Sequence, residues 1–183
     1  MLRREMILGM AALGLAACDT TGNRPLGPDG LPLPAAYIIN SGDEAAIQFR
    51  MLDSVNALRQ TAGVAPVALD ARLTAAAATH SRDMAIQNRP WLFGSDGSSP
   101  VARAQRVGFQ GRLLGENISE SFESEIQTLA AWMAQENTRA VILDPNARFM
   151  GFAWYQEDSA KLWWTLNMGS DPAVSQPIAG LSF

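Results

Sequence analysis

Two acidic or basic side chains in this sequence have the chemistry of a catalytic or metal site. Glu116 lies beside Asn117 in the run LLGENIS (113–119), whose other residues are apolar or small, and His80 is the single histidine of the chain. A carboxylate and an imidazole can together perform acid–base catalysis or donate two ligands to a metal ion. The question is therefore which further groups the chain can bring to Glu116.

The composition argues against a metal site. Zinc takes three or four ligands that usually include histidine or cysteine, and the chain has one of each. Calcium needs six or more oxygen atoms, usually from one loop, whereas the acids of SESFESE (119–125) open a predicted helix. We expect no metal ion and no other cofactor. The net charge of −4 lacks the basic stripe of nucleic-acid binding, so we expect no nucleic-acid partner.

Glu116 has two possible roles. Because side chains alternate along a strand, it is predicted to share a face with Leu114 and Ile118, where a carboxylate is either desolvated or paired with arginine. Arg139 is the expected partner. A structural role is favoured over ligand contact because a lone acid cannot perform paired acid–base work. Asn117, on the opposite face, is expected to hydrogen-bond the backbone.

His80 lies on the apolar stripe of a predicted helix, between Ala77 and Met84. This position is typical of a buried, hydrogen-bonded core histidine. The alternative is a hydrolytic constellation of His80 with Glu116, or with Ser81 and Asp83. The adjacent Ser81 is expected to point away from His80, which disfavours a triad.

The amino terminus has the pattern of an export signal. Arg3 and Arg4 precede twelve apolar or small residues (6–17), a run shorter than the roughly 20 residues that span a bilayer. LAAC (15–18) resembles the bacterial lipobox, in which the cysteine is lipidated. We therefore predict a signal peptide over 1–17 and a lipoprotein anchored through Cys18, facing the periplasm, with the inner membrane possible because Asp19 follows. An ordinary secretory signal and a twin-arginine signal are the alternatives.

The rest of the chain divides into a tether, a domain and a tail. Residues 18–42 are rich in proline and glycine, which predicts an extended tether. The segment YIIN (37–40) could instead dock on the domain. Apolar spacing predicts helices over 43–60, from 70 past Met84, and from 99 to near 108, and another within 121–137. Strands are predicted at 113–119, 149–156 and 161–168, the last two joined by a hairpin. This mixture indicates an α+β fold.

These pieces, in this order, resemble the CAP domain of cysteine-rich secretory proteins, antigen 5 and pathogenesis-related proteins. The matching runs are LDSVNALRQTAGVAPVALDARL, AAATHSRDMA, DGSSPVARAQRVGF, GENIS, AAWM, RAVILDP and GFAWY with WWTLNMG. The resemblance assigns residues 43–170 to the domain and 171–183 to a C-terminal tail. It implies a three-layer α-β-α sandwich with a central antiparallel sheet and a cleft on one face.

In this family the cleft often carries two histidines and two acids that hold a divalent metal. Carried over by position, the histidines correspond to Leu92 and Thr138, and the acids to Glu116 and Gln135. One of the four is retained, so the resemblance implies a cleft that has lost its metal-binding histidines.

The aromatic run beside that cleft suggests what replaces the metal site. Trp91, Leu92 and Phe93 either line an apolar groove for a small molecule or lipid, or close the cleft and stabilise the loop. With His80, Glu116, Asn117, Thr138 and Arg139, Trp91 and Leu92 form the set of candidate ligand-binding residues. We favour a non-catalytic binding or scaffolding module for a lipid, a peptidoglycan fragment or an envelope protein. The alternative is an envelope hydrolase using Glu116 with His80.

Overall fold

The structure, a computed structural model, describes residues 36–172. The predicted signal peptide, Cys18, most of the tether and most of the tail lie outside these residues. The elements follow one another as α1 (Glu44–Thr61), β1 (Ala68–Leu69), α2 (Ala71–Gln87), α3 (Pro100–Arg106), β2 (Leu113–Ser121), α4 (Glu125–Ala134), α5 (Glu136–Ile142), β3 (Phe149–Gln156) and β4 (Leu162–Gly169). None of the described helices is both long and apolar enough to cross a membrane.

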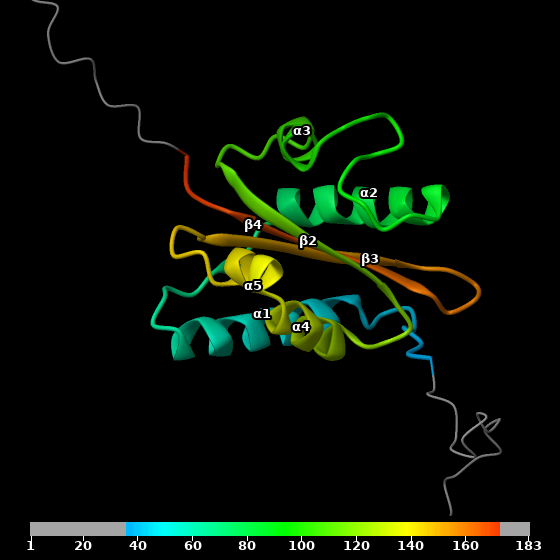
Figure 1. Ribbon diagram of the computed structural model, residues 1–183, viewed down its shortest axis with the longest axis horizontal. Coiled ribbons are helices and arrows are strands. Elements are labelled where there is room, and N and C mark those ends of the chain that lie inside the picture. The colour runs from blue at the N-terminus through cyan, green and yellow to red at the C-terminus, as the bar shows by residue number, and fades with distance from the viewer. Residues whose placement is uncertain (1–35, 173–183) are drawn as a thin grey trace, which may run out of the picture. The chain divides into compact units, whose positions relative to one another are not determined.

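Four strands form one sheet in the order β1-β3-β4-β2, and helices cover both of its faces (Figure 1). The long strands pair antiparallel, whereas the two-residue β1, which the sequence did not indicate, pairs parallel with β3. Helices α2 and α3 lie on one face, and α1, α4 and α5 on the other (Figure 1). The predicted α+β sandwich with three layers is therefore confirmed, with a short parallel strand at one edge.

The central strand β4 divides its side chains between the two layers, as the sequence predicts. Trp164 packs with Phe152 in the larger core, which α1, α4 and α5 cover. Asn167, on the other face, donates from Nδ2 to the carbonyl oxygen of Leu73 in α2. Helix α2 approaches the sheet closely because Gly151 of β3 has no side chain, and a Cβ there would lie 2.2 Å from the backbone carbon of Leu73.

Helices α2 and α3 begin where the sequence indicates, because their N-cap side chains satisfy backbone N–H groups. Asp70 accepts from the N–H groups of Arg72 and Leu73, and Ser99 accepts from that of Ala102. Ser124 caps α4 in a reciprocal capping box with Gln127. Glu125 therefore lies in the first turn as predicted, while Glu123 precedes the helix.

The helix predicted over 121–137 is shorter than expected, and α5, which the sequence analysis did not predict, follows it. The run over 121–137 breaks at Gln135, which has an extended backbone and separates α4 from α5. Side chains of α5 replace the missing helical bonds at the end of α4, since Thr138 Oγ1 donates to the carbonyl oxygen of Trp132 and Arg139 Nη1 to that of Met133. The break turns α5 toward β2.

The segment 37–40 docks on the domain, which was one of the two alternatives for it. Tyr37 donates its N–H to the carbonyl oxygen of Phe122 at 2.8 Å. The Gln156 side chain accepts from the Ile39 N–H and donates to the Tyr37 carbonyl oxygen. Tyr37 and Ile39 also pack against the larger core, so this segment belongs to the folded domain.

Candidate functional site

Glu116 lies in a buried ion pair on the α2–α3 side of the sheet. Its side chain is 1% exposed, and its Oε1 accepts from Arg103 Nη2 of α3 at 2.7 Å. The expected pairing with Arg139 is wrong, because Glu116 faces α3 whereas Arg139 lies in α5 on the opposite face. Nothing in the spacing of the arginines distinguished Arg103, which the sequence reasoning missed.

The strand alternation near Glu116 also differs from the simple prediction. The register of β2 on β4 shifts between Leu113 and Gly115, an irregularity that adds one residue to β2. Leu114 therefore packs against the larger core, and it does not share the face of Glu116. Downstream of the shift, Glu116 and Asn117 do point to opposite faces.

His80 completes a cluster with this ion pair. Its side chain is fully buried, its Nε2 lies 3.0 Å from the carbonyl oxygen of Trp91, and the same nitrogen is 3.5 Å from Glu116 Oε1. Because both neighbours are acceptors, Nε2 carries the proton and donates to Trp91. The Ser81 and Asp83 alternative is contradicted, since Ser81 Oγ donates to Thr165 Oγ1 and Asp83 accepts from the Ser95 N–H and hydroxyl.

Burial shifts the pKa values of His80 and Glu116 in this cluster. Burial of the side chain, together with the positive charge of Arg103, lowers the pKa of His80 to about 4, so the imidazole is neutral at neutral pH. Burial raises the pKa of Glu116 to about 7, against the opposing charge and hydrogen bond of Arg103. At neutral pH the imidazole is therefore uncharged, and the Glu116 carboxyl group beside Arg103 takes up a proton more readily than a free carboxyl group does.

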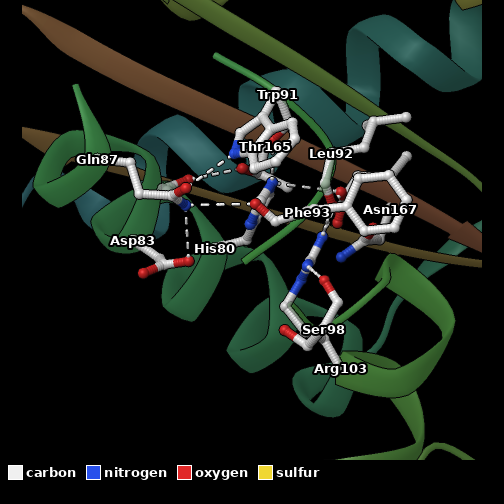
Figure 2. Close-up of polar contacts among 12 residues, drawn as sticks. His80, Asp83, Gln87, Trp91, Leu92, Phe93, Ser98, Arg103, Thr165 and Asn167 are labelled. Atoms are coloured by element: carbon white, nitrogen blue, oxygen red, sulfur yellow. Dashed lines mark hydrogen bonds and ion pairs between the residues drawn. The ribbon is translucent and has the colours of Figure 1, made fainter. Parts of the chain in front are cut away.

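A loop closes over the cluster with its backbone turned inward (Figure 2). Arg103 donates to the carbonyl oxygens of Ser98 and Leu92, at 2.8 and 2.9 Å, and His80 donates to that of Trp91. The side chain of Leu92 is directed outward and is 42% exposed. Loop and cluster therefore stabilise each other. Of the two alternatives for Trp91, Leu92 and Phe93, the structure has the loop that closes over the site and not an open apolar groove.

The aromatic side chains of this loop pack on one another. The Trp91 and Phe93 rings lie 5.6 Å apart, the Arg89 guanidinium covers Trp91 at 4.0 Å, and Trp91 Nε1 donates to Gln87 Oε1 at 2.8 Å. Four surface pockets of about 300 to 510 Å³ on the described part of the chain are lined by other residues, and none includes Glu116 or His80. The site is thus closed to solvent in this structure.

The remaining candidate residues lie on the other side of the sheet. Asn117 is buried and donates from Nδ2 to the carbonyl oxygen of Thr138 at 2.9 Å, which fixes α5 to β2. The polar groups of Thr138 and Arg139 bond the end of α4. The structure therefore brings together His80, Glu116, Trp91 and Leu92, and separates them from Asn117, Thr138 and Arg139.

The fold is an α-β-α sandwich whose edge strand β2 carries GENIS. A model of the CAP family, described as the cysteine-rich secretory protein family, matches residues 52–168. The chain belongs to this family.

This chain is similar in sequence to a Bacillus protein and similar in fold to several solved structures. A Bacillus subtilis protein, YkwD, described as uncharacterized, is 28% identical over 115 residues, which cover 63% of this chain and 45% of the relative. An extracellular SCP-domain protein of Bacillus anthracis superposes with a TM-score of 0.63 at 22% identity, covering 80% of this chain and 45% of that one. An outer surface protein of Borrelia burgdorferi superposes with a TM-score of 0.64 at 12% identity, covering 75% and 99%. The chain thus spans less than half the length of both Bacillus proteins.

The residues at the family's four metal positions do not fit a metal ion here. Glu116 Oε1 already accepts from a guanidinium, the Leu92 side chain has no ligating atom, and the Thr138 hydroxyl is committed to the carbonyl oxygen of Trp132. Within residues 36–172 no three or more His, Cys, Asp or Glu side chains gather closely enough to share an ion.

Proposed function

We propose that this protein is an exported lipoprotein whose CAP domain is a non-catalytic binding or scaffolding module facing the periplasm. The short apolar run behind Arg3 and Arg4, ending at Cys18, supports export and lipidation. The family match and the similarity to an extracellular protein and an outer surface protein agree with export.

One observation carries the non-catalytic part of the proposal. The retained acid of the family site, Glu116, is held by Arg103 beneath the backbone of Trp91 and Leu92. A catalytic acid must reach its substrate directly or through one water molecule, and a side chain that is 1% exposed reaches neither. Partners are therefore expected on the outer surface of the domain. Lipids, peptidoglycan fragments and envelope proteins are the ligand classes proposed.

A second candidate function rests on the short distance between His80 and Glu116. With Nε2 only 3.5 Å from Oε1, the two groups are near enough to act as an acid–base pair in an envelope hydrolase. This function requires the loop that bears Trp91 to open, which breaks the bonds from His80 and Arg103 to its carbonyl groups. The closed loop therefore favours the binding module.

Lipid anchoring is tested by replacing Cys18 with alanine in the full-length chain, expressed in a bacterium that processes lipoproteins. The wild-type protein is expected in the membrane pellet, with a mass increased by acyl chains on Cys18, because several buried chains hold a protein firmly on a bilayer. The Cys18→Ala variant is expected in the soluble envelope fraction. A wild-type protein without added lipid mass would contradict the proposal.

A further inference from the structure

Four exposed apolar side chains belong to the segments that meet where the described chain begins. We define these residues as the N-terminal patch: Ile38, Phe49, Phe122 and Ile126. They are 41% to 58% exposed, and they make up half of the eight large apolar side chains exposed in the described part of the domain. Clusters of this kind mark interaction surfaces, whereas scattered apolar residues do not.

The patch comes from three segments that one polar network ties together. Tyr37 joins the first segment to Phe122 through the backbone bond at 2.8 Å. Arg50 joins α1 to both neighbours, since Nη2 donates to Tyr37 Oη at 3.3 Å and Nε to Glu125 Oε1 at 2.8 Å. Each patch residue is a chain neighbour or member of this network. Figure 1 shows the start of the described chain, the start of α1 and the loop into α4 at the same end of the domain.

The outward direction of the patch is built into the segment 36–40. Exposed and partly buried residues alternate along it, with Tyr37 and Ile39 turned toward the core. Ile38, between them, is therefore held outward, and an apolar side chain is displayed on a docked backbone. This arrangement gives the patch a defined orientation relative to the sandwich.

The position of the patch along the chain indicates its occupant. Only 17 residues separate Cys18 from Ala36, so a lipid on Cys18 can lie at most about 60 Å from the patch. A short link of this kind gives the patch an effective concentration of about the millimolar level at the bilayer that holds the lipid on Cys18. We propose that the N-terminal patch rests on the bilayer to which Cys18 anchors the chain, with its apolar side chains in the headgroup region. This inference depends on the anchoring proposed above.

The charges around the patch indicate which lipids it prefers. Glu123 directly follows Phe122 in the chain, and Asp43 and Glu44 lie between Ile38 and Phe49, while the guanidinium of Arg50 is already paired with Glu125. An acidic rim repels anionic headgroups, and basic residues would be needed to attract them. The patch is therefore matched to a zwitterionic surface.

The test uses the full-length lipidated protein with one thiol label. Cys18 is the only natural cysteine and is acylated, so Phe49→Cys or Ile126→Cys supplies the only free thiol for a polarity-sensitive fluorophore. Matched controls are Ile86→Cys and Val101→Cys, because both side chains are exposed and lie in α2 and α3, in the opposite layer. The proteins are placed in phosphatidylcholine vesicles that contain nitroxide-labelled lipid.

We expect the nitroxide lipid to quench labels at 49 and 126 at least about twofold more than labels at 86 and 101. Replacing half of the lipid by phosphatidylglycerol is expected to reduce this difference. Equal quenching at all four positions, in protein that floats with the vesicles, overturns the orientation and leaves the anchor intact. Protein that carries no lipid on Cys18 and does not float overturns both proposals.

Discussion

Replacing Arg103 with methionine is expected to lower the free energy of unfolding by about 3–5 kcal/mol at pH 7.5. The substitution leaves the Glu116 carboxylate buried without its cation, and it removes the bonds to the carbonyl oxygens of Leu92 and Ser98. Methionine retains most of the side-chain volume, so the lost polar contacts dominate. Urea unfolding followed by tryptophan fluorescence measures the change.

The pH dependence of the stability loss in Arg103→Met identifies the buried Glu116 carboxylate as its cause. Burial already raises the pKa of Glu116 to about 7, and loss of Arg103 removes the charge that opposes this rise. A raised carboxyl pKa means that the folded state binds the extra proton, so its contribution to stability is present below the unfolded pKa and is lost as pH rises through the folded pKa. The deficit of Arg103→Met is therefore expected to shrink at pH 5. Adding Glu116→Gln to the variant should also recover part of the loss.

The exposed Arg106 provides the control. Its guanidinium is 62% exposed and pairs with Asp96, so Arg106→Met is expected to cost at most about 1 kcal/mol and to leave the loop in place. If Arg103→Met proved as mild as this control, or if its deficit did not depend on pH, Glu116 and Arg103 would not form the buried pair.

Replacing His80 with glutamine is expected to remove about 2 kcal/mol of acid-induced destabilisation between pH 7.5 and pH 4.5. The folded pKa of about 4 lies below that of a free histidine, so the neutral ring contributes stability above pH 6.5 that is lost as pH falls through 4. Glutamine cannot titrate, and its amide can still donate to the Trp91 carbonyl oxygen. The variant should therefore become more stable relative to the wild type as pH falls.

Magnetic resonance can observe this histidine directly, because it is the only one in the chain. The imidazole signals of the folded protein are expected to show the Nε2-protonated tautomer and no titration above pH 5. A midpoint near 6.5 would show that His80 is exposed to water, and would revive the hydrolase alternative.

Local sequence patterns were sufficient for most of the fold. Asp70 and Ser99 satisfy backbone donors within three residues, so the helix starts that they set were predicted from the sequence. The start of α4 at Ser124 was predicted about three residues too early. The break at Gln135 did not follow, because side chains of the next helix stabilise it through bonds to Trp132 and Met133. Strand β1 was missed because two residues carry no detectable period.

The site shows the same division between local and long-range causes. The burial of His80 and the alternation of Glu116 and Asn117 follow from helix and strand periods. The choice of Arg103 depends on which helix covers which face of β2, and the position of Leu114 depends on a register shift against β4. Both are tertiary features that the spacing of arginines and leucines along the chain does not encode.

We propose that Glu116 pairs with Arg103 beneath a closed loop and takes part in no metal site. The most direct test is a calorimetric zinc titration of the mature chain, with Cys18 replaced by alanine and with Glu116→Gln as the paired variant. We predict no saturable heat from either protein, because Glu116 is committed to Arg103 and the positions of Leu92 and Thr138 provide no imidazole. Stoichiometric zinc binding that Glu116→Gln abolishes would contradict this account and would restore His80 and Glu116 as a metal site.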